Sequence, residues 1–127
     1  MALTRPDAEA AWVAWLHAGG YGGASTRIPP EHTDGMLRVS RVGGRRINIV
    51  IDEVQMLVEA WHSDPYTASE LAHDAAERIE AARDGAILAA GVQAKNVTTT
   101  GPLEFPDPSS ALTRYQFTFT STLRRVK

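Results

Sequence analysis

The chain has 127 residues, of which 43% are hydrophobic and 22% are charged, and its formal net charge is −2. These values are typical of one soluble globular domain, which we predict to span residues 1–127. Because the chain has no cysteine, disulfides and thiolate metal sites are excluded, and no apolar run is long enough to cross a bilayer.

The first predicted element is a helix from about Thr4 to the Gly19-Gly20 pair. Thr4 supplies a capping hydroxyl, and Pro6 and Asp7 are residue types favoured in a first helical turn. The two consecutive glycines indicate the end of the helix. Apolar side chains between these signals recur at helical spacing and form one stripe, namely Ala8, Ala11, Trp12, Trp15 and Leu16.

Extended segments follow the first helix. A short strand is expected over 26–28, and the alternation in "MLRVSRV" predicts a strand over 36–42. We expect Gly43-Gly44 to reverse the chain. In "INIVIDEV" the isoleucines have odd numbers up to Ile51, whereas the apolar residues from Val54 onward have even numbers. One regular strand cannot hold both sets on the same face, so a bulge or turn is predicted near Asp52-Glu53, before a strand over 54–61.

A second helix is predicted over 62–91. Thr67 and Glu70 have the spacing of a capping box, and Gly91 ends the pattern. Gly85 lies inside this segment and weakens a helix by about 1 kcal/mol relative to alanine. The side chains expected to be buried share one face of the helix and are Leu71, Ala75, Ile79, Ala82 and Ala86.

Two more strands are predicted after the second helix, over 93–100 and 114–125. The loop between them, "GPLEFPDPSS", contains three prolines and cannot join a sheet. The order of elements predicts an α+β fold, with an antiparallel or mixed sheet of four or five strands and two helices packed on one face. The apolar face of the last strand is expected to hold Tyr115, Phe117, Phe119, Ser121 and Leu123.

Charge is distributed unevenly along the chain. Residues 27–46 carry five arginines against two acids, residues 47–110 carry eleven acids against three bases, and residues 111–127 carry four bases and no acid. This separation favours head-to-tail association, in which a basic surface of one copy meets an acidic surface of the next. The alternative is that an acidic helix and a basic turn are both simply solvated.

Known catalytic and metal-binding patterns are missing from the sequence. The four histidines are scattered and do not form the paired motif of a zinc protease helix. "GGYGG" lacks the Gly-Lys-Ser/Thr ending of a phosphate-binding loop, and no serine lies in a Gly-x-Ser-x-Gly motif. We therefore predict that the protein is not an enzyme and has no catalytic site, cofactor or metal.

The clearest cluster of functional residue types is "RVGGRR", at residues 41–46. Arginine makes bidentate contacts with carboxylates and phosphates. The sequence pI of about 6.1 and the lack of a recognition-helix pattern favour a protein partner over DNA. The candidate residues for an interface with another protein chain are Arg38, Arg41, Arg45, Arg46 and Asp107.

Read along nearly its full length, the chain resembles the tail terminators of long-tailed bacteriophages, which join head and tail at the neck. The resemblance rests on "RVSRVGGRRINIVIDEVQMLVEAW", on the capped alanine-rich helix that follows, and on "GPLEFPDP" leading into "RYQFTFTSTLR". The sequence departs from the family pattern at "DGAILAAGVQ", where Gly85 interrupts the expected helix.

The resemblance implies a small α+β virion protein that assembles, in the host cytoplasm, as a hexameric ring on the last ring of the tail tube. Such a ring ends tube growth and meets the head–tail connector or stopper protein. In such a ring the candidate interface residues are expected to contact a neighbouring subunit or the tube. It implies no enzyme activity, no cofactor and no membrane, and at most transient contact with DNA in the channel. Two alternatives stay open, another neck protein such as a stopper, and a nucleic-acid-binding module that uses the arginine turn.

Overall fold

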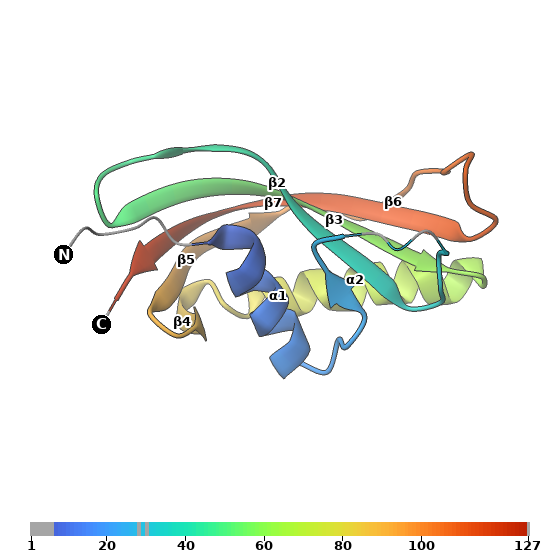
Figure 1. The fold of residues 1–127 in the computed structure, drawn as a ribbon, viewed down its shortest axis with the longest axis horizontal. Coiled ribbons are helices and arrows are strands. Elements are labelled where there is room, and N and C mark those ends of the chain that lie inside the picture. The colour runs from blue at the N-terminus through green and yellow to red at the C-terminus, as the bar shows by residue number, and fades with distance from the viewer. Residues whose placement is uncertain (1–6, 28, 30, 127) are drawn as a thin grey trace.

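Figure 1 shows the computed structural model of the protein, which describes residues 7–27, 29 and 31–126. One mixed sheet of seven strands curves into a half-barrel accompanied by two helices. The strand order is β1-β2-β3-β7-β5-β4, and β6 also pairs with β7. In chain order the elements are α1 (Ala8–Ala18), β1 (Ala24–Ser25), β2 (Met36–Arg46), β3 (Ile51–His62), α2 (Pro65–Glu80), β4 (Asp84–Ala89), β5 (Val92–Thr99), β6 (Leu103–Glu104) and β7 (Thr113–Arg125).

The predicted α+β fold with a four- or five-stranded sheet is wrong. The sheet has seven strands within the described residues, and strand accounts for 46% of the structure. Strands β1 and β6 have two residues each, which is too short to give an alternating pattern in the sequence. The prediction that the loop over 101–110 cannot join a sheet is wrong, because β6 lies in this loop and pairs with β7. The short strand expected over 26–28 is instead β1, and Ile28 lies outside the described residues.

The centre of the sheet consists of β2, β3 and β7. Strand β3 pairs antiparallel with β7 along its whole length, so the strands predicted over 54–61 and 114–125 are confirmed. The strand predicted over 93–100 is β5, displaced by one residue. Alternate side chains of β3 and β7 face the helices and form the core, namely Asp52, Val54, Met56, Val58, Ala60, Phe117, Phe119, Ser121 and Leu123.

Helix α1 bridges the two edges of the half-barrel, because it contacts β1 and β2 on one side and β4 on the other (Figure 1). Trp12 is fully buried on this helix, and its ring meets Phe119 of β7 edge-on, with 4.9 Å between the ring centroids. The predicted apolar stripe is confirmed, because Ala8, Ala11, Trp12 and Leu16 are buried and Trp15 packs against the core.

The ends of α1 are set by Asp7 and Gly19. The Asp7 carboxylate accepts a hydrogen bond from the Ala10 N–H at 3.0 Å and caps the helix. Thr4 and Pro6, which we expected to begin the helix, lie outside the described residues. Gly19 ends the helix as predicted, and its N–H donates to two carbonyls of the last turn.

The second helix is shorter than predicted. Helix α2 ends at Glu80, and residues 84–89 form strand β4, which pairs with β5. Gly85 has a φ of +97°, a left-handed conformation that an α-helix excludes. The predicted helix over 62–91 is therefore wrong in its second half, because Gly85 is a strand residue and Gly91 turns a β-hairpin.

Asp64, rather than Thr67, caps α2. The Asp64 carboxylate accepts hydrogen bonds from the Thr67 hydroxyl at 2.6 Å and from the Thr67 N–H at 3.0 Å. These two bonds, the hydroxyl bond first, lower the pKa of Asp64 below the ordinary 3.8. The folded carboxyl thus binds its proton less readily than the unfolded one.

We expect Asp64→Ala to lower the melting temperature at neutral pH and to have little effect in acid. Since the folded pKa is depressed, the cap stabilises the fold above pH 3.8 and this contribution is lost as the pH falls through the folded value. Thermal melts of both proteins over a pH series measure the difference. Asp74→Ala, an exposed position within the same helix, is the control, and an Asp64→Ala deficit that persists undiminished in acid would contradict the assignment.

The long β2–β3 hairpin does not reverse at Gly43-Gly44 as predicted. Strand β2 continues to Arg46, and the turn lies at residues 47–50, where the N–H groups of Ile47 and Asn48 donate to the Ile51 carbonyl. Of the bulge or turn predicted near Asp52-Glu53, the bulge is absent from β3, and the turn lies slightly earlier, at residues 47–50. The register shift lies in β2 instead, between Arg41 and Gly43.

Gly44 follows this bulge with a φ of +109°. A Cβ at this position would overlap the Glu53 carbonyl oxygen and would lie 2.8 Å from the Val54 Cα. The backbone of β2 can approach β3 here only because residue 44 has no side chain.

We expect Gly44→Ala to lower the free energy of unfolding by about 1–3 kcal/mol, the usual cost of a strained backbone conformation. Urea unfolding measures the change. Gly101→Ala is the matched control, because a Cβ there meets no atom within 4 Å, and it is expected to leave stability unchanged. Equal stability of the two variants would show that the close approach at Gly44 is not required.

Candidate interface surfaces

Arg41, the first residue of the arginine turn, is held inside the protomer. Its guanidinium makes a bidentate contact with Asp52, with N–O distances of 2.8 and 3.2 Å, and donates to the Gly43 carbonyl at 3.0 Å. Asp52 is almost completely buried. The Glu9 carboxylate of α1 accepts from the Arg41 N–H, so this arginine joins α1, β2 and β3.

Arg45 and Arg46 lie at the projecting end of the hairpin. The Arg45 side chain is 78% exposed and lies 3.8 Å from Glu53, which is an exposed and therefore weak ion pair. Arg46 donates to the carbonyls of Asn48 and Ile49 and holds the turn in shape.

Three exposed apolar side chains lie in the same segment of the chain as these arginines. Val42, Ile47 and Ile49 are 52%, 49% and 60% exposed, respectively. The pairing of β3 with β7 also brings Arg124 and Arg125 to this end, where the Arg125 N–H donates to the Val50 carbonyl. We call residues 42–50 together with Arg124 and Arg125 the hairpin end, and Figure 1 shows that it projects past both helices.

The hairpin end has the composition of a protein-binding surface. Exposed apolar side chains supply area that is removed from water on contact, and arginine is enriched in the centres of interfaces. Sequence reasoning found Arg45 and Arg46 but missed the other members. Ile47 and Ile49 resembled strand residues, and the positions of Arg124 and Arg125 depend on long-range pairing.

Arg38 and Asp107 lie at the opposite end of the sheet, on its outer face. There the buried Glu59 carboxylate meets Arg38 at 3.5 Å and Arg114 at 3.2 Å, and Arg114 lies 4.0 Å from Asp107. The structure thus brings Arg38 and Asp107 into one ion-pair network and separates them from Arg45 and Arg46. The role of all five predicted residues in a subunit or tube contact stays a prediction.

The proline-rich loop is fastened to this network. Arg114 donates to the Phe105 carbonyl at 2.8 Å and to the Pro106 carbonyl at 3.3 Å. The hydroxyl and N–H of Ser109 both donate to Asp107 and lower its pKa, in that order of effect. Asp107 therefore orders the loop over the outer face of the sheet.

Trp61 is buried on this same outer face, although no helix covers it. The His32 ring lies 5.4 Å from the Trp61 ring, and the Arg114 guanidinium lies 5.9 Å from it. His32 of the loop before β2 and Arg114 of β7 thus pack against this apolar residue.

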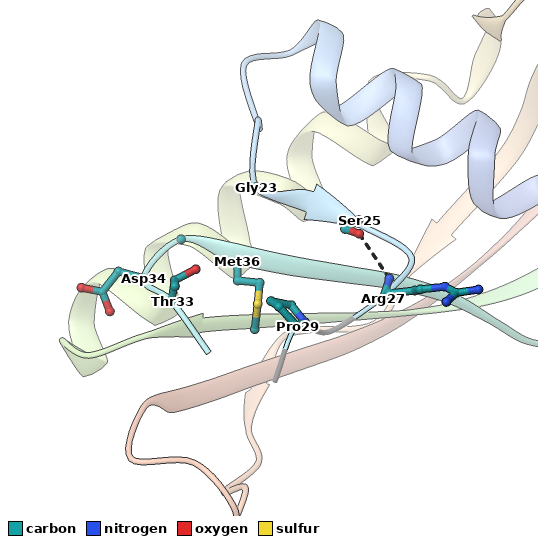
Figure 2. Close-up of a pocket in the computed structure, with 8 residues that line it drawn as sticks. Gly23, Ser25, Arg27, Pro29, Thr33, Asp34 and Met36 are labelled. Atoms are coloured by element: carbon teal, nitrogen blue, oxygen red, sulfur yellow. Dashed lines mark hydrogen bonds between the residues drawn. The ribbon is translucent and has the colours of Figure 1, made fainter. Parts of the chain in front are cut away.

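A cavity of about 560 Å³ lies beside β1 and the start of β2 (Figure 2). Its Ser25 hydroxyl accepts from the Arg27 N–H at 3.2 Å, and Asp34 accepts from the N–H and the hydroxyl of Ser63. The bonds from Ser63, the N–H bond first, lower the pKa of Asp34. These polar groups hold loops together and form no nucleophile–base pair. The described lining residues are Gly23, Ser25, Arg27, Pro29, Thr33, Asp34, Gly35 and Met36.

A second hollow, of about 410 Å³, lies between α2 and the segment that follows β5. Glu77 and Glu80 of α2 give it negative charge, and Glu80 also accepts a hydrogen bond from the Thr99 hydroxyl. We call this hollow the acidic groove. Its lining residues are His73, Ala76, Glu77, Glu80, Thr99, Thr100, Gly101 and Pro102.

The described residues contain few arrangements that suggest catalysis. Ser109 donates its hydroxyl to Asp107 rather than to a histidine, so it is not an activated nucleophile. No three histidine or acidic side chains in the described ranges converge as metal ligands. Neither of the two described helices has the length and apolar character needed to span a membrane.

No protein-family model matches this chain, and no curated protein matches it.

Proposed function

We propose that this chain is a structural virion protein that forms a ring at the end of a phage tail tube. The ring ends polymerisation of the tube and joins the tail to the head connector. The choice of assembly comes from the sequence resemblance to tail terminators over residues 38–61 and 101–124. The fold adds the hairpin end, whose projecting apolar and arginine side chains are suited to contact with another protein chain.

The observation that carries the proposal is the hairpin end. It exposes Val42, Ile47 and Ile49 beside arginines at a point that projects from the half-barrel. A monomer gains nothing from holding these apolar side chains in water, whereas contact with a neighbouring subunit or tube protein buries them. Its arginines would meet carboxylates across that contact.

Electron microscopy of particles assembled without this protein tests the proposed role. We expect tails of irregular length that are not attached to heads, because nothing ends the tube or bridges it to the connector. Tails of uniform length joined to heads would contradict the proposal.

Complementation with variants locates the function on the hairpin end. We expect a chain carrying Arg45→Glu and Ile49→Asp to fail to restore joined particles, because the contact surface becomes acidic and polar. Arg27→Glu makes the same arginine-to-glutamate change at an exposed position away from the hairpin end, and it is expected to restore them.

A second candidate, a nucleic-acid-binding module, is favoured by one observation. Arg45, Arg46, Arg124 and Arg125 gather at one end of the sheet, which makes a larger basic cluster than the turn alone. Fluorescence anisotropy with duplex DNA over a salt series tests it. If DNA is the ligand, Arg45→Ala with Arg46→Ala weakens binding and flattens the salt dependence. A lack of binding at low salt excludes this candidate.

A further inference from the structure

The hairpin end and the acidic groove are complementary in three respects. The hairpin end projects, and the groove is a hollow of about 410 Å³. The hairpin end carries Arg45 and Arg46, and the groove carries Glu77 and Glu80. The small side chains Ala76, Gly101 and Pro102 leave room in the groove for an apolar side chain such as Ile49.

The charge around the groove extends this complementarity. Glu70 and Asp74 are exposed on the same helix, so α2 presents a row of carboxylates to solvent. The hairpin end adds Arg124 and Arg125 to its own two arginines. Arginine and carboxylate pair through charge-assisted hydrogen bonds, which are stronger than neutral ones.

The two surfaces cannot meet within one protomer. The hairpin end projects past the helices on the left of Figure 1, whereas α2 lies beneath the sheet, from the middle to the right of the view. Contact therefore requires a second copy of the chain. Since the two surfaces differ, the contact can repeat head to tail from copy to copy, and such repetition produces a closed ring or an open filament.

We propose that the hairpin end of one copy inserts into the acidic groove of the next copy. Ile49 enters the groove beside α2, and Arg45 and Arg46 face Glu77 and Glu80. This inference rests on the proposed function as a ring protein, for which it names the contact between subunits. It also explains why the basic and acidic parts of the chain lie on separate surfaces.

Site-specific cross-linking tests the contact directly, because the natural chain has no cysteine. Ile49→Cys places a thiol on the exposed hairpin end, and Gly101→Cys places one in the groove, where a Cβ meets no atom within 4 Å. The two purified variants are mixed at high protein concentration and treated with a short bifunctional maleimide. Glu31→Cys, at an exposed position in the loop before β2, replaces Gly101→Cys in the control mixture.

We expect the mixture of Ile49→Cys and Gly101→Cys to give cross-linked dimers in several-fold higher yield than either variant alone or the control mixture. Head-to-tail contact predicts this pattern, because the two thiols belong to different surfaces. Equal yields from a single variant would indicate a symmetric contact and overturn the proposal. No cross-linked dimer in the mixture would overturn it as well.

Charge exchange supplies a second readout. We expect Arg45→Glu in the hairpin partner to lower the cross-linking yield by about tenfold, because attraction becomes repulsion. Glu77→Arg in the groove partner is expected to do the same, and combining the two changes should restore the yield. Arg27→Glu and Glu31→Lys are the charge-matched controls. Failure of the combined changes to restore the yield would contradict the pairing.

The two proposals fail separately. If particles that lack the protein have normal joined tails, the proposed function is wrong, and the cross-linked contact remains a property of the chain. If those particles are defective and the thiols do not cross-link, the function remains and the contact between hairpin end and groove is wrong.

Discussion

Replacing Trp12 by alanine is expected to lower the free energy of unfolding by about 3–5 kcal/mol, the usual cost of removing a buried tryptophan. Trp12 is fully buried on α1, and its ring packs edge-on against Phe119 in the centre of the sheet. Because α1 bridges the two edges of the half-barrel, a cavity at this point weakens the contacts of both edges with the helix. A domain of this size has a total free energy of unfolding of about 5–15 kcal/mol, so the loss is a large fraction of the total.

Thermal and urea unfolding measure the effect of Trp12→Ala, which corresponds to a fall of about 10–20 °C in melting temperature. Trp12→Phe is the matched control. It keeps an aromatic ring against Phe119, and it removes an indole N–H that has no hydrogen-bond partner within the described structure. We expect Trp12→Phe to lose less than half as much stability. Equal losses would show that the aromatic contact is not what holds α1 in place.

Replacing Arg41 by methionine is expected to lower the free energy of unfolding by about 3 kcal/mol or more, because it breaks a buried ion pair on one side only. The change removes both hydrogen bonds from Arg41 to Asp52, whose side chain is 1% exposed. It also removes the bond to the Gly43 carbonyl beside the bulge.

A double-mutant cycle separates the pair from the packing. Arg41→Met combined with Asp52→Leu should recover most of the loss, because an apolar pair can replace a buried ion pair at little cost. Arg45→Met is the control on the same strand, and its exposed pair with Glu53 predicts a loss of at most about 1 kcal/mol. If Arg41→Met costs no more than Arg45→Met, the Arg41–Asp52 pair does not hold the hairpin to the core.

Local patterns in the sequence were sufficient to predict an element where one of its faces is buried and the other is exposed to solvent. The apolar stripe around Trp12 has the spacing of a helix, and the apolar residues of β7 alternate as in a strand. Both predictions are confirmed. The prediction for the segment after Glu80 failed because its alanines favour a helix, and this local preference is overridden by the tertiary fold. The left-handed conformation of Gly85 decides for the strand, and the pairing with β5 that requires it is invisible in a local window.

The candidate surfaces could be predicted only in part. Four arginines and one aspartate were singled out by charge alone. Charge does not reveal whether a side chain points into the protein or towards solvent. Arg41 lies on the same face of β2 as Val39 and contacts the buried Asp52, whereas the bulge after Arg41 places the Arg45 side chain on the opposite face, where it is exposed. The change of apolar positions from odd to even numbers arises because Ile47 and Ile49 lie in the turn rather than in a bulged strand. The acidic groove combines residues of α2 with residues after β5, which only the tertiary fold brings together.

A density map of the intact neck of the virion tests the central claim most directly. The account predicts a closed ring of this chain on the last ring of the tail tube, with each hairpin end seated beside α2 of the neighbouring copy. A map in which this chain is absent from the tail end, or in which every hairpin end faces solvent, would contradict it.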